Sequence, residues 1–451
     1  MPVTQGTMIK SYISAIDFLD QRDIDPNIYD QSRDRAFTDI MKIVDRYKPA
    51  KMFNYHNFVN NDVYEVGTIS AVTSTGLAQI QFTINTAAQF PRVGDLIQTS
   101  NVNNIGKQAR VIAVSFASGT ATLTVRSVGG NTSAFYAANG DLVSFGSNAF
   151  AEQSDSPINR RYGLTKYFNL IQNFREVDVI SDVQKVAKVE VEVNGDFHIL
   201  PYQLIQKVIK LNGDISFQMI AGVQSSTSFG DANPFLADPT TGLPIQTTGG
   251  LDWYVTTYGI NDQAAVLGTF GFTEMDQMIN NWISVKSPTD QMGFMASRPK
   301  RVLDKFFKNL GSAGVTSVRM IIDGRTMDLQ VDHVSYGGYE MDFIHVPIFD
   351  HPQLFGSVRP DITGSIYWVP KDNLETVDGG REPRMQIRHT PSPFMGGSNA
   401  TGFSNGIVTE WRTGALAEAP TNSQMFLKTD WFTAQGLECL GVKLFQKFRI
   451  I

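Results

Sequence analysis

The spacing of apolar residues changes along the chain, and each change predicts a different element. Between Ser32 and Pro49 the apolar residues recur at helical spacing, which predicts a helix that ends at the proline. A shorter amphipathic patch at 12–19 precedes it, joined by the polar residues 21–30. Residues 1–50 therefore form a predicted N-terminal arm and helix. The apolar patch either reaches a neighbouring molecule or packs on its own domain.

Residues 67–146 switch to a period of two, which is typical of short strands. Turn signals such as Ser118-Gly119 separate the alternating runs, and Gly-Asp-Leu enters a strand-like run at Gly94 and again at Gly140. Only six of these 80 residues are charged. Five or six short strands with such turns predict a small all-β barrel or sandwich.

Extended, aromatic-rich segments flank this β-module. Phe53, Tyr55 and Phe58 precede it, and the run 162–171 with Tyr167 and Phe168 follows it. The flanking strands are predicted at 51–66 and 147–180. The module is therefore inserted at the tip of a long two-stranded excursion.

The middle of the chain mixes strands and helices. Residues 183–193 alternate cleanly and end in the turn Asn194-Gly195. A long helix is predicted at about 201–222, with a proline in its first turn and one apolar stripe. Further helices are predicted over 273–282 and 297–311.

Strands return after the last of these helices. Asp323-Gly324 predicts a hairpin between 315–322 and 325–334. Further strands are predicted at 384–389, 407–411 and 441–448. The whole pattern predicts the α+β class.

Composition narrows the class of protein. Charged residues make up 18% of the 451 residues, below the roughly 25% of typical soluble proteins, as expected where partners later cover the surface. The net charge of −6 argues against a nucleic-acid reader, which would show a basic face. Basic residues cluster at Arg160-Arg161 and at Arg298, Lys300 and Arg301.

The single cysteine, Cys439, lies in an apolar context and is interpreted as a small buried hydrophobe. One cysteine cannot form an internal disulfide or a cysteine zinc site. The first residues show no basic segment followed by an apolar one, so we expect no secretion signal, and the sequence lacks the ~18 consecutive apolar residues of a membrane span. We therefore expect synthesis in the cytoplasm and no membrane partner.

The best candidates for chemistry are acidic and histidine residues, the types that bind zinc or iron; they are Asp332, His333, Asp342, His345, Asp350 and His351. Because 342–345 is predicted to be a strand, Asp342 and His345 should point to opposite faces. The sequence contains no nucleophile elbow, phosphate loop or dinucleotide motif. We expect no enzyme, no metal and no cofactor.

In this order of elements the chain resembles the Hong Kong 97-type major capsid proteins of tailed bacteriophages. The segments 162–171 and 408–417 are also similar to those of the crAss-like phage group. The resemblance implies a set of domains: an N-terminal arm (1–50), an E-loop (51–66 and 147–180), a peripheral domain (181–249 and 385–451) with the spine helix at about 201–222, and an axial domain (250–384). The inserted β-module at 67–146 departs from the minimal family pattern.

The same resemblance implies a structural subunit of an icosahedral capsid that self-assembles into pentamers and hexamers. The shell would enclose double-stranded DNA without sequence-specific binding, with portal, scaffolding and decoration proteins as partners. Assembly in the host bacterial cytoplasm and localisation in the virion follow. The expected assembly interface comprises E-loop residues: Phe53, Tyr55, Phe58, Arg160, Arg161, Tyr162, Tyr167 and Phe168. Arg160-Arg161 either pairs with acidic groups on a neighbour or stays solvated.

Two other interpretations stay open. A tail or baseplate protein would form rings or tubes without closed shells. A metal-dependent hydrolase would form a small uniform oligomer whose activity depends on Asp342, His345 or His351. Low charge, the single cysteine and the long extended segments favour assembly.

Overall fold

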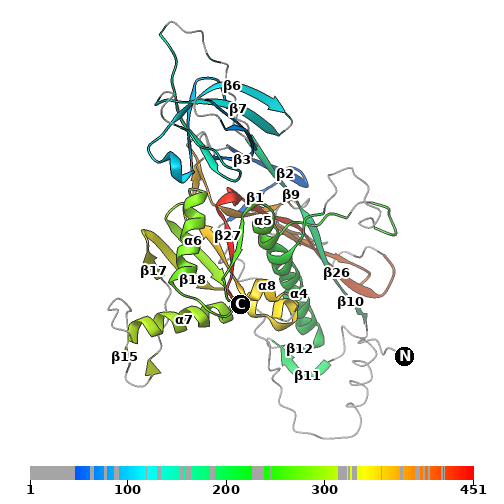
Figure 1. Cartoon of the computed structure of the whole chain (residues 1–451). Helices are drawn as coiled ribbons and strands as arrows, with labels where there is room; N and C mark the ends of the chain where they lie inside the picture. Colours follow the sequence, from blue (N-terminus) through cyan, green and yellow to red (C-terminus); the bar gives the residue numbers. More distant parts are fainter. Residues whose placement is uncertain are drawn as a thin grey trace, which may run out of the picture. The chain divides into compact units, whose positions relative to one another are not determined.

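The computed structural model describes residues 46–451, with gaps at 61–65, 76–78, 86–90, 118, 130–133, 153–156, 158–163, 183–187, 194–195, 226–237, 244, 313–321, 324–325, 328–332, 357, 376–378, 392–396, 400–401, 405–406, 418–419 and 421. Residues 1–45 of the arm and helix predicted at 1–50 lie outside the described residues. The chain divides into two compact units (Figure 1). Unit 2 is His56–Tyr167, and unit 1 comprises the chain up to Tyr55 together with Phe168–Ile451.

Unit 2 is built on a closed β-barrel in the strand order β3-β4-β7-β6-β5-β8. The strands are β3 (Val66–Thr75), β4 (Ile80–Asn85), β5 (Asp95–Thr99), β6 (Ala109–Ala117), β7 (Thr120–Ser127) and β8 (Leu142–Asn148). Alternate residues point inward, so that Phe82, Val111 and Leu123 are fully buried. The predicted β-module is therefore confirmed, and it is a barrel rather than a sandwich.

The two Gly-Asp-Leu repeats lie directly before barrel strands. Gly94 (φ 99°) precedes β5 and Gly140 (φ 90°) precedes β8, and both adopt the left-handed conformation that favours glycine. A Cβ at Gly94 would also lie 2.5 Å from the Phe150 ring. These glycines fix the turns that begin the two strands.

The extended segments around the barrel pair with each other. Strand β2 (Asn54–Asn60) and strand β9 (Leu164–Leu170) form a two-stranded sheet. Each strand runs from one unit into the other, because the division between the units falls at residues 55–56 and 167–168. The barrel is therefore inserted between two strands that pair with each other.

Unit 1 contains a mixed six-stranded sheet in the order β13-β27-β19-β14-β18-β17. Its strands are β13 (Ile260–Gln263), β14 (Asp290–Met295), β17 (His333–Tyr336), β18 (Tyr339–His345), β19 (Ser365–Pro370) and β27 (Gln446–Arg449). Helices cover both faces. Ile366 and Trp368 of β19 pack against helices α6 (Phe272–Ser284) and α7 (Ser297–Ser312). Tyr367 and Val369 belong instead to the core that contains α4 (Ile199–Ala221) and α5 (Leu251–Tyr258).

A second, larger sheet shares the core of α4 and α5. It runs β1-β22-β26-β25-β24-β23, and β10 also pairs with β26. Its strands are β1 (Arg46–Pro49), β10 (Gln172–Ser181), β22 (Met385–His389), β23 (Gly397–Asn399), β24 (Gly402–Ser404), β25 (Val408–Thr413) and β26 (Phe426–Cys439). Ile387, Leu437 and Cys439 point into this core. Cys439 is the buried hydrophobe that the sequence predicted, and burial raises the pKa of its thiol well above its usual value.

Shorter elements complete unit 1. Strands β11 (Lys188–Val193) and β12 (Asp196–His198) pair with each other on either side of the turn predicted at Asn194-Gly195. Strands β15 (Ile322–Asp323) and β16 (Thr326–Met327) pair at the hairpin predicted around Asp323-Gly324, whose outer parts lie outside the described residues. The others are β20 (Leu374–Glu375), β21 (Arg381–Glu382), the helix α8 (Pro360–Thr363), and the short turns at Pro347–Asp350, Pro352–Gly356 and Val442–Leu444.

Two predicted elements are wrong where the structure describes them. The helix expected up to Pro49 is replaced at its end by strand β1, which pairs in parallel with β22. Lys48 precedes a proline and therefore disfavours helix, while Tyr47 packs edge-on against His389. The strand expected at 441–448 begins only at Gln446. Gly441 (φ 70°) turns the chain into a short 3-10 helix first.

The α+β class expected from the sequence is confirmed. The long helix predicted at 201–222 is α4, and the helices predicted at 273–282 and 297–311 are α6 and α7. Among the described helices, none combines the length and apolar character needed to cross a membrane.

Candidate functional site

Four of the six acidic and histidine residues singled out for chemistry form two separate pairs. His333 Nδ1 lies 2.7 Å from Asp342, which also accepts a hydrogen bond from Lys371. His345 Nε2 lies 2.7 Å from Asp350. Asp342 and His345 therefore have different partners, as their spacing on one strand predicts. Asp332 lies outside the described residues. Among the residues that the structure describes, no three His, Cys, Asp or Glu side chains form a group that could hold a metal ion.

Asp350 has a structural role at the start of α7. Its carboxylate accepts hydrogen bonds from the Ser297 backbone N–H at 2.9 and 3.0 Å and from the Ser297 hydroxyl at 2.8 Å. Burial alone would raise the pKa of Asp350, but the hydrogen bonds from His345 and Ser297 outweigh it and hold the pKa below its usual value. A charged Asp350 thus fixes the first turn of α7.

The residues expected at an assembly interface differ in exposure. Phe58 is 62% exposed and Phe53 is 38% exposed, whereas Tyr55 and Tyr167 are buried within the subunit. Phe168 is partly buried. Arg160, Arg161 and Tyr162 lie outside the described residues. Leu164 on β9, which sequence reasoning missed, is 64% exposed.

Tyr55 is instead part of the packing of unit 1. Its hydroxyl donates to the backbone carbonyl of Leu437, and the Arg388 guanidinium lies 5.9 Å from the centre of its ring. Arg388 also pairs with the buried Glu438. Burial raises the pKa of Tyr55 well above its usual value, so this hydroxyl stays protonated and keeps its hydrogen bond.

Asn169 is the centre of a buried polar cluster beside Tyr55. Its Oδ1 accepts hydrogen bonds from the N–H groups of Leu170 and Gly249, each at 2.9 Å. Its amide nitrogen donates to the Thr248 hydroxyl and to the carbonyls of Gly249 and Leu437. One fully buried side chain thereby joins β9, β26 and the loop before α5. No sequence motif marks it, because all its partners except the adjacent Leu170 are 79–268 residues away.

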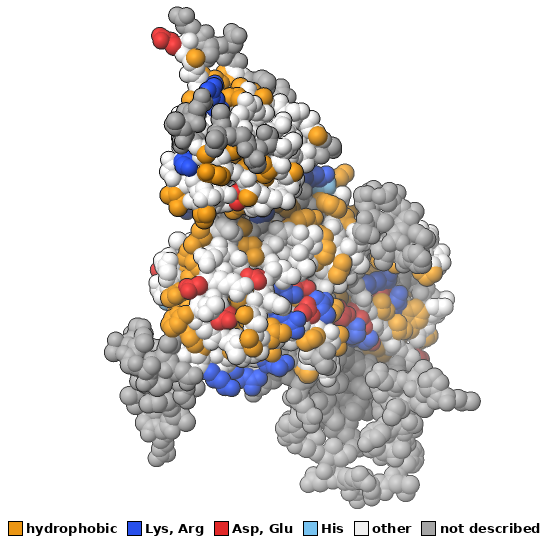
Figure 2. Space-filling view, viewed as in Figure 1, with side chains coloured by type: hydrophobic (Ala, Val, Ile, Leu, Met, Phe, Trp, Pro, Cys, Tyr) orange, Lys and Arg blue, Asp and Glu red, His pale blue; other side chains and the backbone are white. Residues whose placement is uncertain are grey.

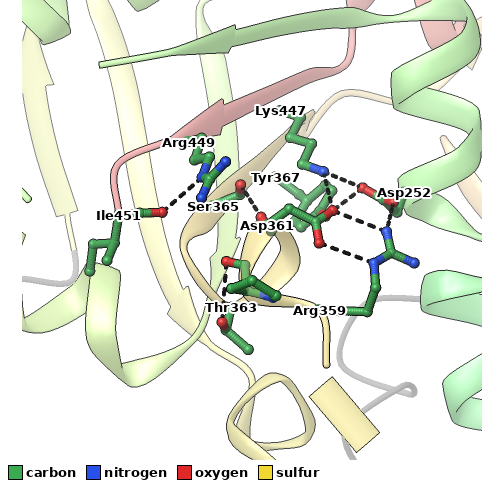
Figure 3. Close-up of polar contacts among 10 residues, drawn as sticks. Asp252, Arg359, Asp361, Thr363, Ser365, Tyr367, Lys447, Arg449 and Ile451 are labelled. Atoms are coloured by element: carbon green, nitrogen blue, oxygen red, sulfur yellow. Dashed lines mark hydrogen bonds and ion pairs between the residues drawn. The ribbon is translucent and has the colours of Figure 1, made fainter. Parts of the chain in front are cut away.

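A second polar cluster lies beside the six-stranded sheet (Figure 3). Asp252 accepts hydrogen bonds from Arg359 at 2.7 Å, from the Tyr367 hydroxyl at 2.7 Å and from Lys447 at 2.6 Å. Asp361 bridges the same two cations, Arg359 and Lys447. The four charged residues of the cluster line a cavity of about 460 Å³ together with Asn261, Asp262, Gln263, Thr256 and Arg449.

The charges of this cluster stabilise one another. Burial alone would raise the pKa of Asp361, but hydrogen bonds and charges from Arg359 and Lys447 outweigh it and depress the pKa strongly. Hydrogen bonding to Asp361 is the main cause that raises the pKa of Arg359. The side chain of Lys447 is almost fully buried and forms ion pairs with both Asp252 and Asp361.

The outer face of the larger sheet carries a groove of about 510 Å³. Trp411 on β25 is 40% exposed there, and Val179 on β10 is 56% exposed. The groove is lined by Arg175, Thr409, Trp411, Thr413, Lys428, Asp430 and Phe432. The opposite face of β26 carries Trp431, which belongs to the core. Aromatic side chains are enriched at surfaces that bind other proteins, and here Trp411 lies in the same groove as the ion pair between Lys428 and Asp430.

Comparison with known proteins gives one family match. The family model described as SU10 major capsid protein matches residues 53–345 of this chain. The search of curated proteins found no match.

Solved capsid structures are similar to the chain over most of its length. The capsid of a native GTA particle has 8% identity and a TM-score of 0.41, over 96% of both chains. The structure titled Microbacterium phage Oxtober96 has 8% identity and a TM-score of 0.40, over 97% of this chain and 98% of its own. The capsid of cyanophage A-1(L) has 11% identity and a TM-score of 0.39, over 67% and 83%.

Proposed function

The chain belongs to the SU10 major capsid protein family, and from this premise we propose that it assembles into pentamers and hexamers through the β2–β9 hairpin. It is a structural subunit of an icosahedral bacteriophage capsid and is part of the virion. The order of hairpin, spine helix α4 and mixed sheets agrees with the Hong Kong 97-type fold. The narrower similarity to the crAss-like group stays a prediction.

The exposed apolar side chains of the hairpin are the observation that carries this proposal. Phe58 on β2 and Leu164 on β9 are each more than 60% exposed. Large exposed apolar side chains on a two-stranded sheet are unfavourable in water and are covered when a partner binds. In a shell of identical subunits, the partner is a neighbouring copy, and a contact between two different surfaces closes into rings.

The groove on the outer face of β10, β25 and β26 is the surface that we propose receives the neighbour's hairpin. Trp411 offers an aromatic anchor, and the pair Lys428–Asp430 offers a polar rim. The hairpin and the groove are different surfaces, as a ring of identical subunits requires. Tyr55 and Tyr167 contribute indirectly, because their burial stabilises the subunit that presents Phe53 and Phe58.

The remaining parts of the proposal follow the family role. Residues 1–50 act as an arm, 181–249 and 385–451 as the peripheral domain, and 250–384 as the axial domain. The shell assembles in the host bacterial cytoplasm, encloses double-stranded DNA, and takes portal, scaffolding and decoration proteins as partners. Its role is structural rather than enzymatic.

Electron microscopy of the expressed protein tests the hairpin contact. We expect closed shells or hexamer sheets from the wild type, and their loss in the double variant Phe58→Ser with Leu164→Ser. The folded subunit should remain, because exposed side chains change stability by about 0.5 kcal/mol or less. The matched control is Val266→Ser with Leu267→Ser, two exposed apolar residues after β13. Shells at wild-type yield from the hairpin variant would refute the proposal.

A further inference from the structure

Helix α7 has two chemically different faces. Leu303 and Phe307 are buried in the core beside the six-stranded sheet, with Val302 and Phe306 packed against them. Asp350 holds the first turn through Ser297. The helix is therefore fixed in position along its apolar side and at its N-terminus. The residues on the outer face of α7 are therefore also held in a fixed position.

The outer face presents a row of positive charge. Arg298, Arg301 and Lys305 are all exposed. They follow one another at i, i+3 and i+7, which places them on one side of a helix over about 10 Å. Figure 2 shows Lys and Arg side chains gathered in a row over α7 without acidic side chains among them. Within the described part of the chain, these three residues make no ion pair.

The neighbouring charges do not neutralise this row. Asp304 is the one acidic residue of the helix and is only partly exposed, as is Lys300. Two further aspartates lie on elements packed against α7. Asp350 is hydrogen-bonded to His345 and Ser297, and Asp342 is hydrogen-bonded to His333 and Lys371. Near the Asp252 cluster, by contrast, cations and carboxylates alternate (Figure 3). The α7 row is thus a local excess of positive charge on a chain of net charge −6.

We propose that the outer face of α7, formed by Arg298, Arg301 and Lys305, contacts the phosphate backbone of the DNA that the shell encloses. The inference rests on the proposed function, because it assigns the face of the subunit that meets the DNA. Duplex DNA carries about one negative charge per 1.7 Å of its axis, so a row of three cations over about 10 Å always finds phosphates, whatever the sequence. The three contacts of one subunit bind DNA weakly, but the contacts of all subunits in a closed shell act together on the same DNA.

Binding of a fluorescein-labelled 24-bp duplex of arbitrary sequence to the purified full-length subunit tests this contact. Fluorescence anisotropy is measured from 50 to 200 mM salt for the wild type and for Arg298→Gln/Arg301→Gln/Lys305→Gln. Each phosphate contact contributes about −0.9 to the slope of log K against log salt. We expect the triple variant to bind more weakly and its slope to be less negative by about 2.7. Over this fourfold range of salt, that difference corresponds to about 40-fold in affinity.

The control variant removes the same charge elsewhere. Lys286, Arg381 and Lys443 are exposed on separate elements of unit 1, and their replacement by Gln should leave most of the DNA affinity. Equal losses in both variants would show a response to net charge alone, and absence of wild-type binding would likewise overturn the proposal. Unchanged DNA binding with loss of shells would instead assign the α7 row to an acidic surface of a second copy. Shell formation, scored separately by electron microscopy, reports on the proposed function itself.

Discussion

Replacing Asn169 by alanine should destabilise unit 1 more than any other single polar truncation near the hairpin base. The change removes Oδ1, which accepts hydrogen bonds from the N–H groups of Leu170 and Gly249. Both groups lie in a site where Asn169 and Thr248 are 0% exposed, so water does not replace the lost acceptor. Each buried donor left without an acceptor costs about 1–3 kcal/mol, which gives about 2–6 kcal/mol for Asn169→Ala.

Urea unfolding of the purified subunit, followed by tryptophan fluorescence, measures this loss. Trp253 lies against Gly249, so its emission reports on the affected loop directly. The matched control is Asn173→Ala, the same chemical change at an exposed position of β10, for which we expect a change of about 0.5 kcal/mol or less.

A free energy of unfolding for Asn169→Ala within about 0.5 kcal/mol of the control would refute the reasoning. It would mean that the Leu170 and Gly249 N–H groups find other acceptors when the side chain is removed. A smaller urea midpoint with an unchanged slope would instead confirm a loss of stability without a change in the surface exposed on unfolding.

Two further predictions concern pH and the barrel. The folded-state pKa of Asp361 is depressed, so its stabilising contribution is present above the unfolded pKa of about 4 and is lost as the pH falls toward the folded value. The urea midpoint of the wild type should therefore fall more steeply between pH 5 and pH 2 than that of Asp361→Asn; parallel curves would contradict this. Replacing residues 67–146 by a short Gly-Ser linker should leave the unfolding free energy of unit 1 within about 1 kcal/mol, because the buried barrel residues all lie between Ile69 and Phe145. A larger loss in calorimetry would show that unit 1 depends on the barrel.

Local patterns in the sequence identified most elements correctly. The period of two at 67–146 and its glycine turns predicted the barrel because its strands pair among themselves and enclose their own core. The apolar stripes of α4, α6 and α7 predicted these three helices correctly. Strand β1 was missed because its pairing with β22, more than 300 residues later, is decided by tertiary contact.

Only part of the candidate site could be predicted from the sequence. The aromatic character of the hairpin predicted a contact surface, but the side of the strand on which each residue lies could not be read. Phe58 points to solvent, whereas Tyr55 points into unit 1 toward Leu437. Asn169 and the Asp252 cluster carry no local pattern, since each is completed by residues from distant segments.

The sequence by itself determined the kinds of elements and their order, because periodicity and turn residues act over a few positions and need no distant partner. It also determined the low charge and the basic residues of α7. Only the tertiary structure decided which side chains became buried anchors and which stayed exposed for a neighbour. Burial and hydrogen-bond partners depend on segments that meet only when the two sheets and helix α4 pack into one core.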